Sequence, residues 1–342
     1  MRFLFVGGGT GGHLTPAIGL AEGLEARGHE TLFLLSGRDV EQSYVADGRA
    51  CKSLAFESSR FPRPFALLGD GMRARKHARR FRPDAVIALG GAASAASLLI
   101  PHAPLVLLEG NFVVGRSVKW MASFSALILT MFEPTAKQLK RSVAMGPVTR
   151  KLLQPQDVAS ARAKFGLDPQ RKTILVMGGS QGAMDLNQLA RSLLPELEKA
   201  DWQMLAICGA GKGQHLEAAG YPNLVLLDHC NEMGAAYSAA DFALTRGGAS
   251  TVGELWLHGL PAAVLPYPWH KDRQQEHNTR ALEPGLLCLH GTDPNAHLET
   301  ILRCLTDDDT RAIMRDSLTA QRPPDGQGIG VAQLEEIAAP KH

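Results

Sequence analysis

The sequence predicts an α/β fold made of two doubly wound domains, and three features of the 342-residue chain point to it. A chain of this length exceeds what one hydrophobic core usually supports, so two domains are expected. Short apolar runs alternate with amphipathic helical patterns, which is typical of parallel sheets covered by helices. This alternation then begins a second time in the second half of the chain, which indicates two Rossmann-like halves.

In the first domain, the expected strands are short apolar segments that end at glycines or turns, as parallel strands buried on both faces do. A helix is expected over residues 16–27, because its apolar side chains share one face and Gly28 provides a stop signal. The expected strands cover residues 3–6, 31–35, 85–89, 105–108 and 126–130.

The same order of elements resumes at residue 173. We expect a first domain of residues 1–149 and a second domain of residues 150–325, with the hinge at residues 147–152. A helix over about residues 326–342, after the Pro323-Pro324 break, is expected to pack back on the first domain. The expected strands of the second domain cover residues 173–177, 204–208, 224–227, 242–245 and 262–266.

Composition excludes several classes of protein. Five cysteines without CxxC spacing argue against a disulfide framework and against a zinc site. The apolar run after Met1 is too short for a signal peptide, and no run of about 20 apolar residues is uninterrupted. A net charge of +2 gives no general case for binding nucleic acid. A cytoplasmic protein with no nucleic-acid partner is expected.

A glycine-rich turn, Gly7 to Gly12, follows the first strand, opens the first helix and ends in His13. Such a turn lets the backbone approach a ligand and presents helix N–H groups, although helix–sheet packing alone also selects glycine. NAD binding is disfavoured, because residues 34–38 hold no acidic residue for an adenosine ribose. The near-neutral pKa of His13 suits removing a proton from a hydroxyl; a capping or solvent-bonded histidine is the alternative.

Three further motifs stand at strand-to-helix turns of the second domain. Residues 177–183 repeat the glycine turn, and the Ser180 hydroxyl with free N–H groups suits a pyrophosphate. Residues 245–254 end in Glu254, whose carboxylate can accept two hydrogen bonds from a ribose diol or can complement the helix dipole. Residues 270–275 end in paired glutamines, which suit sugar hydroxyls or a solvated helix start.

A basic and apolar stretch covers residues 60–82. This mixture suits docking on anionic lipid, and the alternative is a solvated helix with its apolar face in the core. The apolar members are Phe61, Phe65, Leu67, Leu68 and Met72, and the basic members are Arg60, Arg63, Arg73, Arg75, Lys76, Arg79, Arg80 and Arg82.

Four motifs in order, at residues 8–13, 178–183, 246–254 and 270–275, resemble the MurG family of peptidoglycan synthesis, which belongs to glycosyltransferase family 28. The resemblance implies a GT-B fold whose two domains face each other across a cleft. It implies inverting transfer of GlcNAc from UDP-GlcNAc to the muramyl C4 hydroxyl of lipid I, giving lipid II and UDP without a metal or other cofactor. The implied partners are UDP-GlcNAc, a lipid I-like acceptor, the cytoplasmic face of the anionic inner membrane and cell-wall synthesis proteins.

The resemblance also implies roles for single residues. The second domain is expected to hold the donor. Ser180 and Thr251 are expected to contact the pyrophosphate, and Gln181 and Gly182, which follow Ser180, to contact the donor as well. Glu254 is expected at the ribose, Gln274 and Gln275 at the GlcNAc, Arg150 at a phosphate and Cys230 at the uracil. The first domain is expected to supply His13 as the base, Thr10 with Gly11 and Gly12 as substrate-binding residues, and Asn111 at the donor sugar.

Two loops of the first domain depart from the family pattern. Residues 108–111 read Leu-Glu-Gly-Asn where the family has His-Glu-Gln-Asn, and residues 90–96 lack the family's aromatic residue and proline. Both lie in the domain expected to select the acceptor. Two alternatives therefore stay open: a related UDP-sugar transferase with a different lipid or small-molecule acceptor, and an inactive nucleotide-sugar-binding paralogue.

Overall fold

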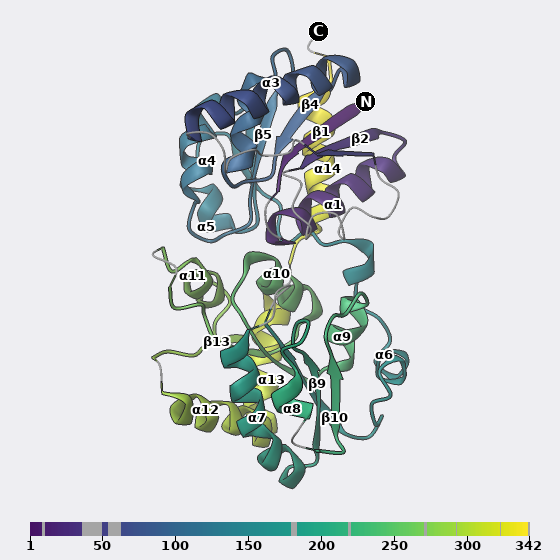
Figure 1. The fold of residues 1–342 in the computed structure, drawn as a ribbon, viewed down its shortest axis with the longest axis vertical. Helices are drawn as coiled ribbons and strands as arrows, with labels where there is room; N and C mark the ends of the chain where they lie inside the picture. The colour runs from purple at the N-terminus through teal and green to yellow at the C-terminus, as the bar shows by residue number, and fades with distance from the viewer. Residues whose placement is uncertain are drawn as a thin grey trace. The chain divides into compact units, whose positions relative to one another are not determined.

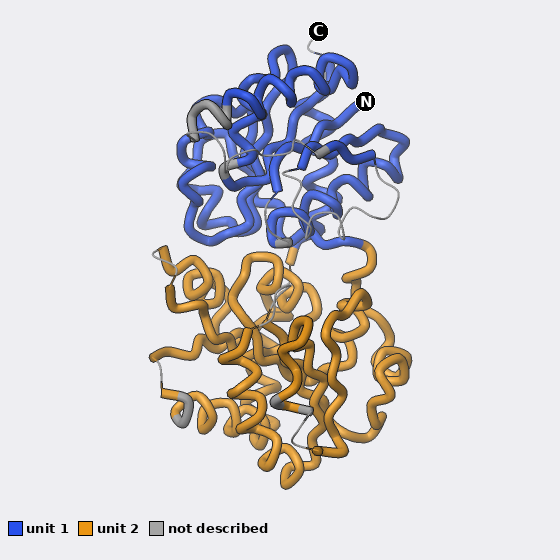
Figure 2. The backbone as a smooth tube through the Cα atoms, in the orientation of Figure 1, with its two compact units in different colours: residues 1–150, 324–342 blue, residues 151–323 orange. Residues whose placement is uncertain are grey.

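The computed structural model divides the chain into two compact units, coloured separately in Figure 2. Unit 1 contains Met1–Arg150 and Pro324–His342, and unit 2 contains Lys151–Pro323. The chain therefore passes from one unit to the other after Arg150 and again at Pro324. The structure describes residues 1–8, 11–35, 50–53, 63–178, 183–217, 220–269, 272–291, 293–321 and 323–340.

Unit 1 contains a seven-stranded parallel sheet with the order β3-β2-β1-β4-β5-β6-β7 (Figure 1). The order reverses direction at β1, so the chain winds outward to both sides of this strand. Phe3 of β1 pairs with Thr31 on one side and with Ala85 on the other. The strands are β1 (Arg2–Gly7), β2 (Glu30–Leu35), β3 (Cys51–Ser53), β4 (Ala85–Ala88), β5 (Leu105–Glu109), β6 (Leu127–Thr130) and β7 (Ser142–Ala144).

Helices cover both faces of this sheet. Phe3 and Phe5 pack with α1 and α14 on one face, whereas Leu4 and Val6 pack with α3, η1 and α4 on the other. Burial on both faces explains why the strands are continuously apolar. The helical elements are α1 (Gly11–Ala26), α3 (Arg63–Phe81), η1 (Ala92–Leu99), α4 (Arg116–Met121), η2 (Ala122–Phe124), α5 (Glu133–Ala136) and α14 (Gly326–Ala338).

The C-terminal helix α14 packs against α1, far from it in sequence but in the same unit. The side-chain amide of Gln327 donates to the carbonyl of Gly19 at 2.6 Å. Glu335 forms ion pairs with Arg27 at 2.8 Å and with His29 at 2.8 Å. The last helix therefore completes the core of the first unit.

Unit 2 contains a six-stranded parallel sheet with the order β10-β9-β8-β11-β12-β13. Its chain order reverses at β8, as it does at β1 in unit 1. Ile174 of β8 pairs with Met204 on one side and with Phe242 on the other. The strands are β8 (Lys172–Met177), β9 (Trp202–Ile207), β10 (Leu224–Leu227), β11 (Phe242–Thr245), β12 (Ala262–Val264) and β13 (Leu286–Cys288).

The core of unit 2 packs α7, α12 and α13 against Ile174, Val176 and their neighbours. Asp157 caps α6 by accepting from the N–H of Ser160, and Asp307 caps α13 in the same way. The helical elements are η3 (Lys151–Leu153), α6 (Val158–Lys164), α7 (Met184–Lys199), α8 (Gln214–Glu217), α9 (Met233–Ala239), α10 (Ala249–His258), α11 (Gln274–Arg280), α12 (Pro294–Thr306) and α13 (Asp308–Ala320).

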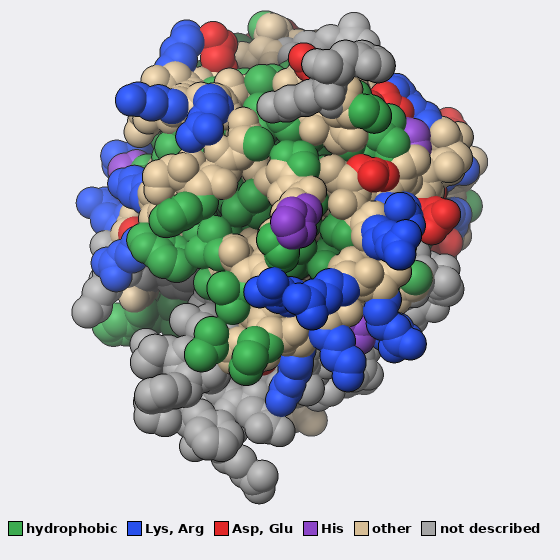
Figure 3. Space-filling view, turned by 90° about the horizontal axis from the view of Figure 1, so that it is seen from above, with side chains coloured by type: hydrophobic (Ala, Val, Ile, Leu, Met, Phe, Trp, Pro, Cys, Tyr) green, Lys and Arg blue, Asp and Glu red, His purple; other side chains and the backbone are tan. Residues whose placement is uncertain are grey.

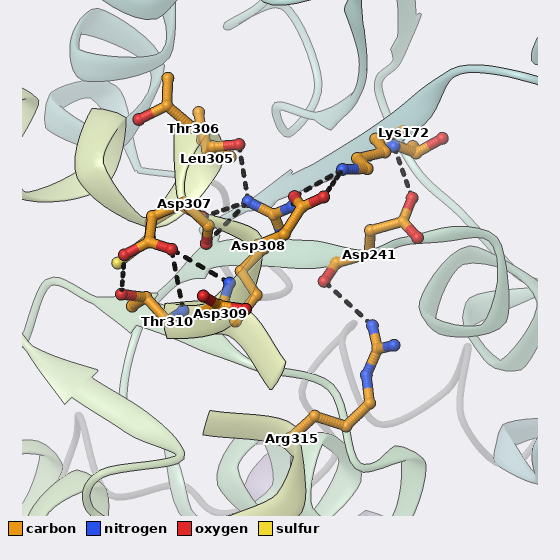
Figure 4. Close-up of polar contacts among 12 residues, drawn as sticks. Lys172, Asp241, Leu305, Thr306, Asp307, Asp308, Asp309, Thr310 and Arg315 are labelled. Atoms are coloured by element: carbon orange, nitrogen blue, oxygen red, sulfur yellow. Dashed lines mark hydrogen bonds and ion pairs between the residues drawn. The ribbon is translucent and has the colours of Figure 1, made fainter. Parts of the chain in front are cut away.

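A cluster of charged side chains lies at the amino ends of β8 and β11 (Figure 4). Asp241 accepts from the N–H of Thr173 at 2.7 Å and pairs with Arg162 at 2.7 Å. Asp308 binds both Lys172, at 2.6 Å, and Arg311. Ligands of doubly wound sheets bind at the opposite, carboxyl edge, so this cluster joins α6 and α13 to the sheet as a structural feature.

Candidate functional site

A pocket of about 440 Å³ opens at the carboxyl ends of the unit 2 strands. It lies at the point where the strand order reverses between β8 and β11, which is where doubly wound sheets bind ligands. Its lining residues come from the segment after β8, the start of α7, the turn after β11, the segment that joins β12 to α11, and the first turn of α11. They are Gly178, Ala183, Met184, Asp185, Arg246, Tyr267 and Gln275.

Arg246 forms an ion pair with Asp185 in the wall of this pocket. Its guanidinium donates to both carboxylate oxygens of Asp185 at 2.6 Å and to the carbonyl of Leu265 at 2.9 Å. It also lies 5.6 Å from the centre of the Tyr267 ring. These contacts hold the guanidinium in place and balance its charge with the Asp185 carboxylate. The N-terminus of α7 beside it is the group that favours a phosphate-containing ligand.

The paired glutamines form the first turn of α11. The side-chain carbonyl of Gln275 accepts from the backbone N–H of Tyr267 at 2.9 Å, and Gln275 lines the pocket. Gln274 is half-buried in the same turn. The contacts of Gln275 with the pocket wall differ from the solvated helix start that the sequence also allowed.

Glu254 lies in the second turn of α10 and is 8% exposed. Its carboxylate accepts a hydrogen bond from the hydroxyl of Tyr237 at 2.6 Å. The helix has no acidic residue in its first turn, so Glu254 does not serve as a dipole partner at the helix start. Thr251 does stand in that first turn and is half-buried.

Cys230 and Arg150 occupy connecting segments. Cys230 follows β10 and is half-buried, and burial raises the pKa of its thiol. A thiol that stays protonated is not a nucleophile, so Cys230 fits a contact role rather than a chemical one. Arg150 is the last residue of unit 1 before the chain enters unit 2.

Four of the expected residues, Thr10, Ser180, Gln181 and Gly182, lie outside the described part of the chain. Gly178 and Ala183, which stand on either side of the second glycine turn, both line the pocket.

His13 lies in the first turn of α1, where the strand order of unit 1 reverses between β1 and β4. The helix begins at Gly11 and not at residue 16, so the end of the glycine run, with His13, belongs to the helix itself. A Cβ atom on Gly90 would lie 3.3 Å from the His13 ring, and one on Gly91 would lie 3.6 Å from it. Two glycines with φ of 95° and 73° thus let backbone lie flat against the imidazole.

Burial lowers the pKa of His13 below its ordinary value, although a hydrogen bond to the backbone of Gly8 acts in the opposite direction. The imidazole is therefore mostly neutral at pH 7, which is the form that can accept a proton. This environment fits the base role expected for His13 and does not require it.

Asn111 is held by the buried carboxylate of Glu109 at the end of β5. One Glu109 oxygen accepts from the backbone N–H of Asn111 at 2.9 Å and from its side-chain amide at 3.0 Å. The other oxygen accepts from the N–H of Gly115 at 2.6 Å. Glu109 is 3% exposed, and burial raises the pKa of its carboxyl group. Glu109 thus orders the loop that carries Asn111.

Sequence reasoning missed Asp185, Tyr267 and Tyr237. Asp185 stands two residues after the second glycine turn and Tyr267 lies between two prolines, so each was close to a recognised motif. Tyr237 carried no local signal, because its contact with Glu254 joins two different helices.

Comparisons with known proteins give a consistent assignment. The glycosyltransferase family 28 N-terminal domain matches residues 3–130, and the family 28 C-terminal domain matches residues 173–316. The UDP-N-acetylglucosamine–N-acetylmuramyl-(pentapeptide) pyrophosphoryl-undecaprenol N-acetylglucosamine transferase of Halothermothrix orenii is 30% identical over 311 residues, covering 83% of this chain and 83% of the relative. The protein of the same name from Moorella thermoacetica is 32% identical over 312 residues, covering 82% and 83%.

Solved structures share the fold over nearly the full length. The crystal structure of Acinetobacter baumannii MurG matches with a TM-score of 0.74 and 22% identity, covering 98% of this chain and 99% of that chain. A UDP-GlcNAc 2-epimerase from Neisseria meningitidis, bound to UDP-GlcNAc, matches with a TM-score of 0.68 and 13% identity, covering 98% and 100%. Because proteins with different reactions share this GT-B fold, the sequence relatives decide the family. The chain belongs to glycosyltransferase family 28 and to its MurG group of N-acetylglucosaminyltransferases.

Proposed function

We propose that this enzyme transfers GlcNAc from UDP-GlcNAc to the C4 hydroxyl of the muramyl sugar in undecaprenyl-pyrophosphoryl-MurNAc-pentapeptide, forming lipid II. The names of the sequence relatives support these substrates. The observation that carries the donor half of the proposal is the unit 2 pocket, whose wall combines Arg246, the start of α7 and Gln275. These groups suit a diphosphate that is joined to a sugar.

In this proposal, unit 2 binds the donor and stabilises the leaving group. The pyrophosphate is contacted by Ser180 and Thr251, together with Gln181, Gly182 and the N-terminus of α7. Glu254 binds the ribose, and Gln274 and Gln275 bind the GlcNAc. Cys230 lies at the uracil and Arg150 at a phosphate. Arg246 and the helix N–H groups stabilise the negative charge that grows on UDP as the bond from the anomeric carbon to its oxygen breaks.

Unit 1 supplies the acceptor chemistry. Thr10, Gly11 and Gly12 contact substrate, and Asn111 reaches the donor sugar. Neutral His13 accepts the proton of the C4 hydroxyl while that oxygen attacks the anomeric carbon, and UDP leaves with the bonding electrons. Attack from the face opposite the leaving group inverts the anomeric configuration.

We also propose that unit 1 docks on an anionic cytoplasmic membrane surface, where a lipid-linked acceptor resides. In the described part of the chain, no helix is both long enough and apolar enough to cross a bilayer. Exposed apolar side chains lie on α3, η1, α4 and η2, and these elements pack in sequence: α3 on η1, η1 on α4, and α4 on η2. They are Leu68, Met72, Leu99, Trp120 and Phe124.

Basic side chains accompany this apolar surface. Arg75, Lys76 and Arg79 are exposed on α3, the same helix as Met72. Figure 3 shows one face of the molecule, on which hydrophobic side chains lie next to groups of Lys and Arg side chains. An apolar patch bordered by Lys and Arg suits the interface of an anionic bilayer.

One incubation tests the substrates. Purified enzyme is mixed with UDP-GlcNAc and a lipid I analogue, and the release of UDP and the formation of lipid II are measured. We expect both products in equal amounts. UDP release only with a different acceptor would favour the related transferase that the altered loops 90–96 and 108–111 suggest. Donor binding without release with any acceptor would favour an inactive paralogue.

A further inference from the structure

We infer that Tyr237 is a positioning residue for donor binding, which acts by holding the carboxylate of Glu254 toward the ribose of the UDP-sugar. This inference rests on the proposed function, because it assumes that Glu254 binds the ribose. Tyr237 lies on α9 and Glu254 on α10, so the contact fixes one helix against the other at the donor site.

The contact is short and buried. The Tyr237 hydroxyl lies 2.6 Å from one Glu254 oxygen, within the range of a strong charge-assisted O–H···O⁻ hydrogen bond. Tyr237 is 1% exposed and Glu254 is 8% exposed. An ionised carboxylate can accept about four hydrogen bonds on its two oxygens. The bond from Tyr237 occupies one of these acceptor positions and fixes the rotation of the carboxylate group that the proposed function places at the ribose diol.

The ring of Tyr237 packs against the side chain of His258. His258 packs on it with ring centres 5.1 Å apart and an angle of 38° between the planes. The Nε2 atom of His258 lies 2.9 Å from the carbonyl oxygen of Leu153, an atom that can only accept, so Nε2 carries the proton. A chain of contacts thus runs from Leu153 to His258, from His258 to Tyr237, and from Tyr237 to Glu254.

The first residues of unit 2 complete this support. A Cβ atom on Gly234 of α9 would lie 2.5 Å from the carbonyl oxygen of Leu152, so only glycine allows this close approach. Because α9 is held in this way, the Tyr237 hydroxyl has a fixed direction, and the carboxylate that it binds needs little ordering when the donor arrives.

Binding of UDP and of 2′-deoxyUDP to wild type, Tyr237→Phe and Ser238→Ala tests the role of Tyr237. Tyr237→Phe removes only the hydroxyl, and Ser238→Ala removes a hydroxyl on the same helix that faces the connecting segment. We expect wild type and Ser238→Ala to prefer UDP by about tenfold to a hundredfold, as a hydrogen bond to a charged group predicts. We expect the preference of Tyr237→Phe to fall below about threefold. For turnover, the KM for UDP-GlcNAc should rise in Tyr237→Phe by a similar factor, with kcat nearly unchanged.

Two results would overturn the inference, and they differ. If wild type prefers UDP and Tyr237→Phe keeps the full preference, Tyr237 has only a packing role. If wild type binds UDP and 2′-deoxyUDP equally well, Glu254 does not bind the ribose 2′-hydroxyl, and the contact of Glu254 with the ribose diol in the proposed function fails as well. A cycle with Glu254→Gln gives a second measurement: Tyr237→Phe should change KM much less in the Glu254→Gln background, since both act through one carboxylate.

Discussion

His13 combines two properties that a general base needs. Its ring lies against the backbone of Gly90 and Gly91, so few orientations are open to it. Burial lowers its pKa below the ordinary 6.5, so the neutral form persists to a lower pH than in a free histidine. The close approach of the ring needs glycine at positions 90 and 91, which follow β4, and the lowered pKa comes from the burial of the ring.

The pH dependence of turnover follows from this burial. Because burial lowers the pKa of His13, the acid limb of kcat/KM should have its midpoint below pH 6.5. His13→Ala should lower kcat by about 10²-fold to 10⁴-fold, which is the usual contribution of a positioned base. The measurement is the initial rate of UDP release between pH 5 and 8.

A matched control for this experiment is His102→Asn. His102 is exposed at a φ of 71°, a conformation that asparagine tolerates, so this change removes an imidazole without straining the chain. Its pH profile should be that of wild type. An acid limb in wild type that lies above 6.5, or a profile that His13→Ala leaves unchanged, would show that another group is the base.

The loop after β5 depends on one buried carboxylate. Glu109→Ala would leave the N–H groups of Asn111 and Gly115 without the Glu109 carboxylate as acceptor. Each of these groups that water does not reach should lower the free energy of unfolding by about 1–3 kcal/mol. We expect a lower unfolding midpoint and a higher KM for UDP-GlcNAc, because Asn111 loses its fixed position. Calorimetry and initial rates measure these effects. If stability falls while KM is unchanged, Asn111 does not contact the donor.

Helix α3 should set the strength of membrane binding. Charge reversal in Arg75→Glu/Arg79→Glu should weaken binding to vesicles with 30% anionic lipid by at least about twentyfold, since each basic side chain near the surface contributes about 1 kcal/mol. The matched control is Arg191→Glu/Lys199→Glu on α7, which makes the same charge change at exposed positions of unit 2. Co-sedimentation measures binding. Equal weakening by both pairs would mean that net charge, and not this surface, controls it.

The helices and strands could be predicted where the pattern of apolar residues in the sequence was long enough to recognise. Each expected strand is present, because a strand buried on both faces shows as a continuous apolar run. β3, β7 and β13 were not expected from the sequence, because each is only three residues long and has no period to detect. β12 is equally short, but it was expected because it lies within the longer apolar run of residues 262–266. The start of α1 was placed too late, because the helix begins within the glycine run, and glycines give no helical signal in a sequence.

At the scale of the whole molecule, the site was predictable only where its residues follow one another in the chain. The glycine turn before α7 and the glutamine pair of α11 stand beside strand ends, so topology places them at one edge of a sheet. The Arg246–Asp185 and Tyr237–Glu254 pairs join different elements, 61 and 17 residues apart in sequence. No local sequence pattern predicts such pairs, because the tertiary packing of the helices determines which side chains come into contact.

The return of α14 to unit 1 has a consequence for how the molecule unfolds. Leu334 of α14 is fully buried in the unit 1 core, although it follows the whole of unit 2 in the chain. Leu334→Ala should therefore destabilise unit 1 by about 2–5 kcal/mol, the usual range for a buried leucine. Its matched control is Leu318→Ala, an equally buried leucine of α13 in unit 2.

Calorimetry with and without UDP distinguishes the unfolding transitions of the two units. A ligand stabilises only the unit that binds it, by about 2.7 kcal/mol at a concentration of one hundred times Kd, so UDP should raise the unit 2 transition alone. Leu334→Ala should lower the transition that UDP does not move, and Leu318→Ala should lower the one that it does. If Leu334→Ala instead lowered only the UDP-sensitive transition, α14 would belong energetically to the donor-binding unit, and the return of the chain to unit 1 would contribute nothing to stability.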